Sequence, residues 1–252
     1  MSEESKVEAV AEDTAAAAPE VEAAPKKKKK KWPIVVGVVV VVLVAAGAGF
    51  WVWHEQPSFC NAICHTPMDP YLETWNNEPG TTGVDKYGNE VSNTDAMLVV
   101  SHKKSTEEGG AGTDCLGCHV PTLSEQIQEG MNWISGNYEA TQLENGTYVL
   151  PERSGEDLVE ARGLEADQFC LNEACHHVDD NGNPINTRED LKAATADLPR
   201  NVHIGQHGPV ACTECHKAHR ASVVYCTQCH SDVEIPDGWL TYQEGNDLPG
   251  VE

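Results

Sequence analysis

Ten cysteines occur in this chain of 252 residues, and they form five close pairs, each followed directly by histidine. The five stretches read CNAICH, CLGCH, CLNEACH, CTECH and CTQCH, so that no cysteine is left over. Covalent c-type haem requires two thiols close together for the thioether bonds and an imidazole beside them for the iron. The pattern therefore predicts five covalently attached haem c groups, which a fold of this chain has to accommodate.

The two cysteines of each pair would hold the haem, and the histidine after them would be the proximal iron ligand. The attachment residues are then Cys60, Cys64, Cys115, Cys118, Cys170, Cys175, Cys212, Cys215, Cys226 and Cys229, and the proximal ligands are His65, His119, His176, His216 and His230. A disulfide framework or zinc sites also use paired cysteines, but neither requires a histidine after every pair. The first and third pairs are more widely spaced than the usual motif, which leaves these two less certain than the others.

Six histidines lie outside the attachment motifs, namely His54, His102, His177, His203, His207 and His219. A six-coordinate haem iron needs a second axial ligand, commonly His or Met. All of these histidines except His54 fall in the haem-bearing region, and we expect them to be distal ligands. The sequence does not show which haem each one ligates.

Residues 34–53, IVVGVVVVVLVAAGAGFWVW, are almost all apolar and carry no charge. About twenty such residues cross a bilayer core of about 30 Å as a helix, and Trp32, Trp51 and Trp53 suit its two interfaces. A cleaved signal peptide is the competing interpretation, but its apolar region is usually about 7 to 15 residues long. We therefore predict an uncleaved, single-pass anchor in the cell membrane.

Lysines fill every position from Lys26 to Lys31, within a basic juxtamembrane segment of residues 26–33. A solvated charge run and a nucleic-acid contact are the alternatives, but the apolar span follows at once. Positive residues beside a span mark its cytoplasmic side, so the N-terminus is predicted to be cytoplasmic and the haem domain outside. Residues 1–25, rich in Ala, Glu and Pro, have the composition of a disordered acidic tail.

The mean hydropathy is low and the chain has three Phe, so an ordinary apolar core of matching size would be hard to build. The predicted fold class is a multihaem cytochrome c, with one N-terminal transmembrane helix and a mainly α, loop-rich, haem-packed exported domain with little sheet. We divide the exported part into a dihaem region (54–140), a linker (141–154), a trihaem region (155–235) and a C-terminal tail (236–252).

From His54 onward the chain holds 33 of its 40 acidic residues but 10 of its 17 Lys and Arg residues, a net charge of −23. This balance excludes a nucleic-acid partner. It suits docking to a basic face on another protein.

The stretches CNAICHTPMDPYLETW and VVSHKKSTEEGGAGTDCLGCHVPT, together with the apolar span, resemble the NapC/NirT/NrfH family of membrane-anchored quinol dehydrogenase cytochromes. The resemblance covers roughly residues 34–140. It implies that Met68 ligates the first haem, that His102 is a distal ligand, and that menaquinol is oxidised beside the first haem at the membrane surface. The family usually has shorter spacings within the first motif and between its His and Met, which leaves open whether Met68 or His65 ligates this iron.

The second half, from CLNEACHH to CTQCHSDVEIPDGW, resembles small tetrahaem cytochromes and the cytochrome domains of flavocytochrome c fumarate reductases. This resemblance implies bis-His haems of low potential. By analogy it points to an exported flavoprotein or molybdoenzyme reductase as the partner, while the oligomeric state is left open.

The leading hypothesis is an anchored pentahaem cytochrome that carries electrons from menaquinol to an exported terminal reductase in anaerobic respiration. Quinol oxidation releases protons, and Asp69, Glu55 and His54 are candidate acceptors by position alone. The alternative is an electron relay reduced by another membrane complex, without its own quinol site. Terminal reduction of a small oxyanion at an open haem is disfavoured, because no motif ends in Lys in place of His.

Overall fold

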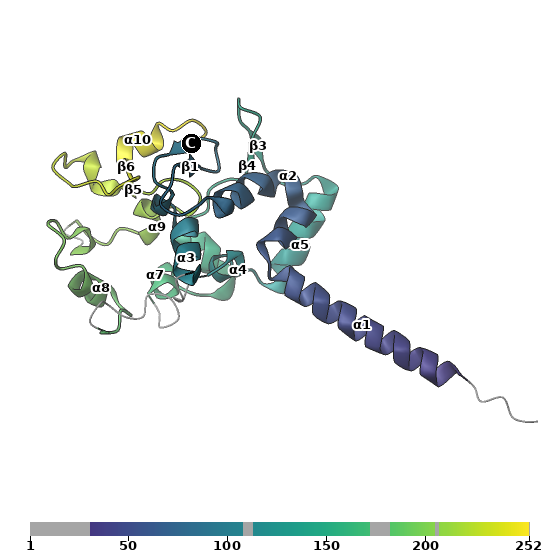
Figure 1. Cartoon of the computed structure of the whole chain (residues 1–252). Coiled ribbons are helices and arrows are strands. Elements are labelled where there is room, and N and C mark those ends of the chain that lie inside the picture. Colours follow the sequence, from purple (N-terminus) through teal and green to yellow (C-terminus); the bar gives the residue numbers. More distant parts are fainter. Residues whose placement is uncertain (1–30, 108–112, 172–181, 205–206, 252) are drawn as a thin grey trace, which may run out of the picture. The chain divides into compact units, whose positions relative to one another are not determined.

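The computed structural model describes residues 31–107, 113–171, 182–204 and 207–251 (Figure 1). The chain divides into two compact units, residues 1–46 and residues 47–252. Helix α1 (Trp32–His54) begins in the first unit and ends in the second, and none of its 23 residues is buried. Among the described residues it is the one helix long and apolar enough to cross a membrane, and it includes the predicted span.

Short helices and turns make up most of the second unit, and the strands have two residues each. The helices after α1 are α2 (Pro57–Asn76), α3 (Leu98–Glu107), α4 (Cys115–Cys118), α5 (Leu123–Ser135), α6 (Gly155–Val159), α7 (Ala166–Cys170), α8 (Arg188–Ala194), α9 (Cys212–Cys215) and α10 (Tyr242–Asn246), with 3-10 turns η1 (Thr94–Ala96), η2 (Glu160–Arg162), η3 (Val202–Ile204) and η4 (Tyr225–Gln228). Strands β1 (Gly83–Val84) and β2 (Glu90–Val91) pair antiparallel, as do β3 (Thr141–Gln142) and β4 (Tyr148–Val149), whereas β5 (Val223–Val224) and β6 (Leu240–Thr241) pair parallel. The predicted mainly helical, loop-rich fold with little sheet is confirmed.

Helix boundaries follow local sequence signals. Helix α5 begins with a reciprocal capping box between Thr122 and Glu125, and it ends at Gly136, whose φ of 71° is the left-handed conformation that glycine adopts most easily. Helix α2 begins with Pro57, which fits the first turn because its missing N–H would have no helical partner there. Further along α2, Pro67 and Pro70 each remove one backbone donor from the helix.

The apolar core is a small cluster around α3. Val91, Met97, Val100 and Ala221 are buried there, and Leu240 packs against them. The backbone of residues 217–222 docks on the start of α3, where Leu98 donates to the Lys217 carbonyl at 2.9 Å and Ser222 Oγ donates to the Ala96 carbonyl at 2.6 Å. The predicted dihaem and trihaem regions are therefore hydrogen-bonded to each other within one unit.

The segments assigned as the linker and the C-terminal tail contain short regular elements. Strands β3 and β4 lie within residues 141–154, and β6 and α10 lie within residues 236–252. Both are short elements closed by local bonds, such as the capping box of Thr241 and Glu244 at the start of α10.

Candidate haem sites

The three regularly spaced motifs share one backbone hydrogen bond. The pairs Cys115–Cys118 and Cys212–Cys215 each form one turn of α-helix, whereas Cys226 lies in the 3-10 turn η4 and Cys229 directly follows that turn. In each motif the N–H of the following histidine donates to the carbonyl of the first cysteine. These bonds are 2.7 Å from His119 to Cys115, 3.0 Å from His216 to Cys212 and 3.0 Å from His230 to Cys226. One turn of helix brings residues four apart to the same side, so both thiols and the imidazole can meet one cofactor.

The two wider motifs are built differently. Cys60 and Cys64 both belong to α2. The side chains of Cys64 and His65 are outside the described part, while Met68 is half-buried on the same helix. Cys170 is the last residue of α7. Cys175, His176 and His177 lie outside the described residues.

The thiols of successive motifs are spatial neighbours. Burial, and then the Cys60 thiol, raises the pKa of Cys115 to about 11. A hydrogen bond with Cys212 raises the pKa of Cys170, to which burial and the Cys118 thiol also contribute. Burial raises the pKa of Cys215, and the Cys226 thiol adds to this effect. Each motif thus lies within electrostatic range of the next, in the order of the chain.

Seven of the described cysteine side chains are free thiols, namely Cys60, Cys115, Cys170, Cys212, Cys215, Cys226 and Cys229. They are available for thioether bonds to haem.

Two pairs of imidazole rings face each other across a gap. The ring centres of His119 and His219 are 6.4 Å apart with 28° between their planes, and those of His207 and His230 are 6.2 Å apart with 27° between their planes. A transition metal bonded to both rings would hold the centres about 6.2 Å apart, because the metal–nitrogen bond is about 2.0 Å and each centre lies about 1.1 Å further. Each pair combines a predicted proximal ligand with a predicted distal one, so both pairs fit axial ligation of a haem iron.

Hydrogen bonds fix which nitrogen of His219 is able to bind a metal. Its Nδ1 lies 2.6 Å from Oγ1 of Thr74, and that hydroxyl donates its own proton to the Tyr71 carbonyl at 2.8 Å. The hydroxyl must then accept from Nδ1–H, which leaves the lone pair on Nε2. Metal-binding histidines are held in this way by a partner on their other nitrogen.

The same arrangement recurs at two more predicted distal ligands. Nδ1 of His102 lies 2.7 Å from the Leu98 carbonyl, an acceptor without a proton to give, so Nδ1 carries the hydrogen. Nδ1 of His203 lies 3.1 Å from Oγ1 of Thr195, whose proton goes to the Leu191 carbonyl at 2.8 Å. In both residues the lone pair is again left on Nε2.

The rings of His219, His119 and His203 are neutral at ordinary pH. Burial lowers the pKa of His219 to about 3, helped by His119 and by the cationic Lys86. Burial also lowers the pKa of His119 and His203. His119 nevertheless keeps an exposed surface. Neutral imidazole is the form that binds metals.

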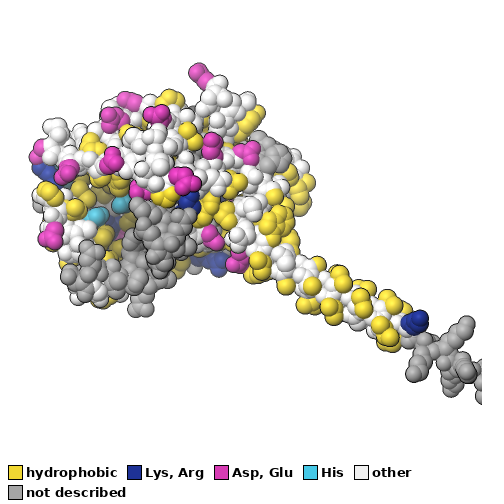
Figure 2. Space-filling model, viewed as in Figure 1, with side chains coloured by type: hydrophobic (Ala, Val, Ile, Leu, Met, Phe, Trp, Pro, Cys, Tyr) yellow, Lys and Arg dark blue, Asp and Glu magenta, His cyan; other side chains and the backbone are white. Residues whose placement is uncertain are grey.

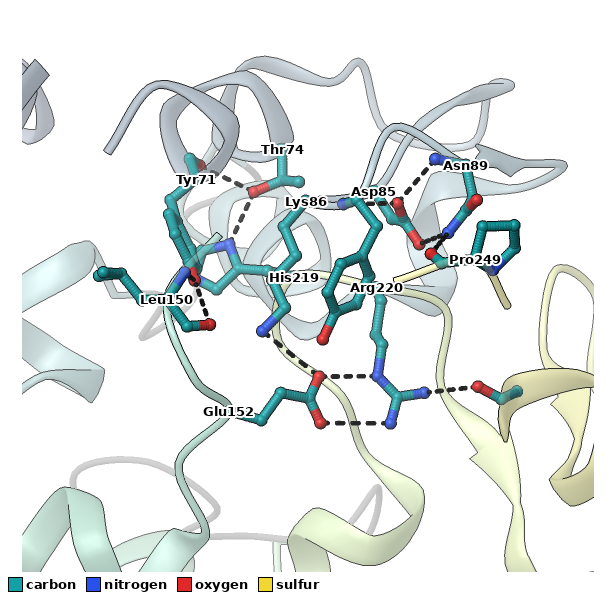
Figure 3. A network of polar contacts seen from close by, with 12 residues as sticks. Tyr71, Thr74, Asp85, Lys86, Asn89, Leu150, Glu152, His219, Arg220 and Pro249 are labelled. Atoms are coloured by element: carbon teal, nitrogen blue, oxygen red, sulfur yellow. Dashed lines mark hydrogen bonds and ion pairs between the residues drawn. The ribbon is translucent and has the colours of Figure 1, made fainter. Parts of the chain in front are cut away.

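A network of polar contacts surrounds His219 (Figure 3). Glu152 accepts from Arg220 Nε at 2.8 Å and from Nη2 at 3.3 Å, and it lies 3.4 Å from Lys86 Nζ. Burial opposes the charge on Glu152, but the Arg220 hydrogen bond and both cations lower its pKa to about 2. Tyr71 completes the network through its hydroxyl, which bonds to the backbone of Leu150.

Sequence reasoning missed Thr74, Thr195 and Glu152. The partners Thr74 and His219 are 145 positions apart, and Glu152 and Arg220 are 68 apart, so no local pattern marks them.

The three candidate proton acceptors lie in different surroundings. His54 Nε2–H donates to Gln126 Oε1 at 2.9 Å, while its Nδ1 is buried without a hydrogen-bond partner among the described atoms. Its ring packs on Phe59, with centres 4.8 Å apart. Asp69 accepts from Asn61 at 2.6 Å and borders a hollow with Glu73 and Tyr148. Glu55 is exposed.

A model of the cytochrome c3 family matches residues 160–231, which include the last three motifs. The cytochrome c-type protein Cgr1 of Eggerthella lenta is 62% identical over 203 residues, which cover 81% of this chain and 84% of that protein. No solved structure matches the chain. Identity at this level across most of both chains, together with the motif turns and the facing imidazoles, shows that this chain belongs to the multihaem cytochromes c.

Proposed function

We propose that this chain is a membrane-anchored pentahaem cytochrome that carries electrons from menaquinol to an exported reductase. The observation that carries the proposal is the geometry of the two facing histidine pairs. Haem supplies reversible one-electron transfer, and the protein places it and tunes its ligands. The residues described above perform that second task.

Bis-His ligation follows from the ring pairs. His119 and His219 would ligate the second haem, and His207 and His230 would ligate the fifth. His203 would be a distal ligand for one of the others, because its Nδ1 is bonded to Thr195 and its lone pair is on Nε2; His102, held through Nδ1 by the Leu98 carbonyl, is proposed for another. With both axial positions filled, no site would be open for a small substrate, which argues against terminal oxyanion reduction.

The order of the motifs in space supports a conducting path. Electron transfer needs redox centres close together, and the thiols of successive motifs influence one another from Cys60 through to Cys226. A path in chain order would begin at the first motif, on α2, which follows the end of α1. Electrons would then leave from the later motifs.

Quinol oxidation would take place where α1 joins the second unit. His54 is the strongest candidate for the proton, since its Nδ1 is buried in an aromatic cluster with no hydrogen-bond partner. The lysine run before α1 supports a cytoplasmic N-terminus and an exported second unit. The net charge of −23 from His54 onward would steer this unit to a basic surface on the reductase.

The test uses the haem-loaded full chain in phosphatidylcholine nanodiscs without oxygen. A menaquinol analogue should reduce its haems, as measured by the visible absorption bands, and His54→Ala should slow the reaction at least fivefold. Asp69→Asn serves as a comparison at a second candidate acceptor, and dithionite should reduce every variant fully. Haems that dithionite reduces but the quinol does not would overturn the quinol step and favour the relay without a quinol site.

A further inference from the structure

Helix α5 carries a stripe of exposed apolar side chains. Leu123, Ile127, Met131 and Ile134 are 72%, 59%, 60% and 74% exposed. Their spacing of four, four and three residues brings them to one face of the helix. The described residues do not bury this face, although large apolar side chains are normally buried.

Polar side chains on the other faces of α5 have partners. Glu125 closes the capping box with Thr122, and Glu129 forms an ion pair with Arg153 at 3.2 Å. Gln126 contacts His54. The helix is therefore held to the unit through polar contacts, which leave the apolar stripe facing outward.

The end of α1 that belongs to the second unit lies next to this helix. The His54–Gln126 hydrogen bond joins the two, and the ring of Phe59 packs on both His54 and Trp53 at 4.8 and 5.0 Å. Trp51 and Val52 beside them are 64% and 66% exposed. In Figure 2 hydrophobic side chains gather over α5 and α2 on this part of the unit. Apolar surface thus continues from the end of α1 onto α5.

We infer that α5 lies in the surface of a phospholipid bilayer, with the stripe of Leu123, Ile127, Met131 and Ile134 among the acyl chains. This inference rests on the proposed membrane anchor. Lipid is the occupant that fits, because the apolar surface is continuous with the end of a helix able to span a bilayer, and because an amphipathic helix buries such a face at the interface. Helix α5 contains no Lys or Arg, so its insertion does not depend on anionic lipid.

A position of α5 in the bilayer surface would also bear on how electrons reach the first haem. Glu129 on α5 is close enough to Cys60 to raise the pKa of that thiol, after burial as the main cause. A helix lying in the interface would hold the first attachment motif directly above the acyl chains. A lipid-soluble donor would then reach it without leaving the membrane.

The experiment places a thiol on or off the stripe of the haem-loaded full chain, as Ile127→Cys or as the matched control Gln128→Cys. Gln128 is also exposed, one position along the same helix but turned toward the polar face. Both variants are placed in phosphatidylcholine nanodiscs and treated with a charged maleimide. In parallel, an uncharged photoreactive probe dissolved in the lipid is used to label the chain. Haem absorbance shows that both variants are folded.

The charged maleimide should modify Ile127→Cys at least tenfold more slowly than Gln128→Cys, with equal rates after denaturation. The lipid probe should label the peptide of residues 123–135 as well as α1. Equal maleimide rates in nanodiscs would refute the inference. Protection of Ile127→Cys without lipid labelling of α5 would also refute it, since haem or another protein would then cover the stripe. If the lipid probe labels α1 but not α5, the inference about α5 is refuted and the proposed membrane anchor stands. If α1 is not labelled, the proposed anchor itself is contradicted.

Discussion

Glu152 is the acceptor for two buried cations, and its replacement by Gln tests how much the network around His219 stabilises the fold. The side chains of Arg220 and Lys86 are 5% and 6% exposed, while that of Glu152 is 37% exposed. Glu152→Gln keeps the shape but leaves both cations without a counter-charge. Unpaired buried charge is among the most destabilising changes a protein can undergo.

The magnitude follows from the pKa of Glu152, which is about 2 in the folded chain against the usual 4.5. That difference corresponds to about 3.4 kcal/mol at about 1.36 kcal/mol for each pH unit. Solvent reaches more than a third of the carboxylate and screens it, so we expect a loss of about 2 kcal/mol in the free energy of unfolding at pH 7.

The direction of the pKa shift determines how the stability difference between wild type and Glu152→Gln should change with pH. A carboxylate whose pKa is depressed by folding stabilises the folded chain above its unfolded pKa, and this contribution is lost as the pH falls toward the folded value. The stability gap between wild type and Glu152→Gln should therefore be full above about pH 4.5 and shrink as the pH falls toward about 2.

Urea unfolding of the haem-loaded protein in mild detergent, followed by circular dichroism in the haem band, measures this gap. Glu144→Gln, at an exposed carboxylate in the turn between β3 and β4, is the matched control and should change stability by less than about 0.5 kcal/mol. Equal stability of wild type and Glu152→Gln at pH 7, or a gap that does not change between pH 5 and 3, would refute the reasoning.

The remaining predictions concern the haems. Thr74→Val removes the hydroxyl that holds His219, so the reduction potential of one haem should shift by about 59 mV, which corresponds to a tenfold change in a one-electron equilibrium; a titration that overlays wild type for every haem would contradict this. His207→Ala should convert one haem to the high-spin form in the electron paramagnetic resonance spectrum, whereas His54→Ala should not; a low-spin spectrum for His207→Ala would mean that another group ligates the fifth haem. The intact mass of the mature chain should exceed that of its polypeptide by five haem groups, and an excess of three would show that the two wider motifs are unused.

Local patterns in the sequence were sufficient to predict much of the fold. The apolar run at residues 34–53 predicts α1, and the motif spacing together with the scarcity of aromatic residues predicts a helical, loop-rich domain. The same local patterns could not predict contacts between residues that are far apart in the sequence. His219 lies beside Thr74 because residues 217–222 hydrogen-bond to the start of α3, and no periodicity encodes that docking. The pairing of His119 with His219 depends on it, so ligand pairs could not be read from spacing.

Helix α2 contributes to two sites at once. It carries the first predicted attachment motif, and through Thr74 and Tyr71 it also orients His219, whose ring lies beside that of His119, the predicted proximal ligand of the second motif. A substitution in this helix would therefore perturb two cofactors together. The same sharing should limit movement of one site relative to the other, and rigid surroundings that need little rearrangement when charge arrives favour fast electron exchange.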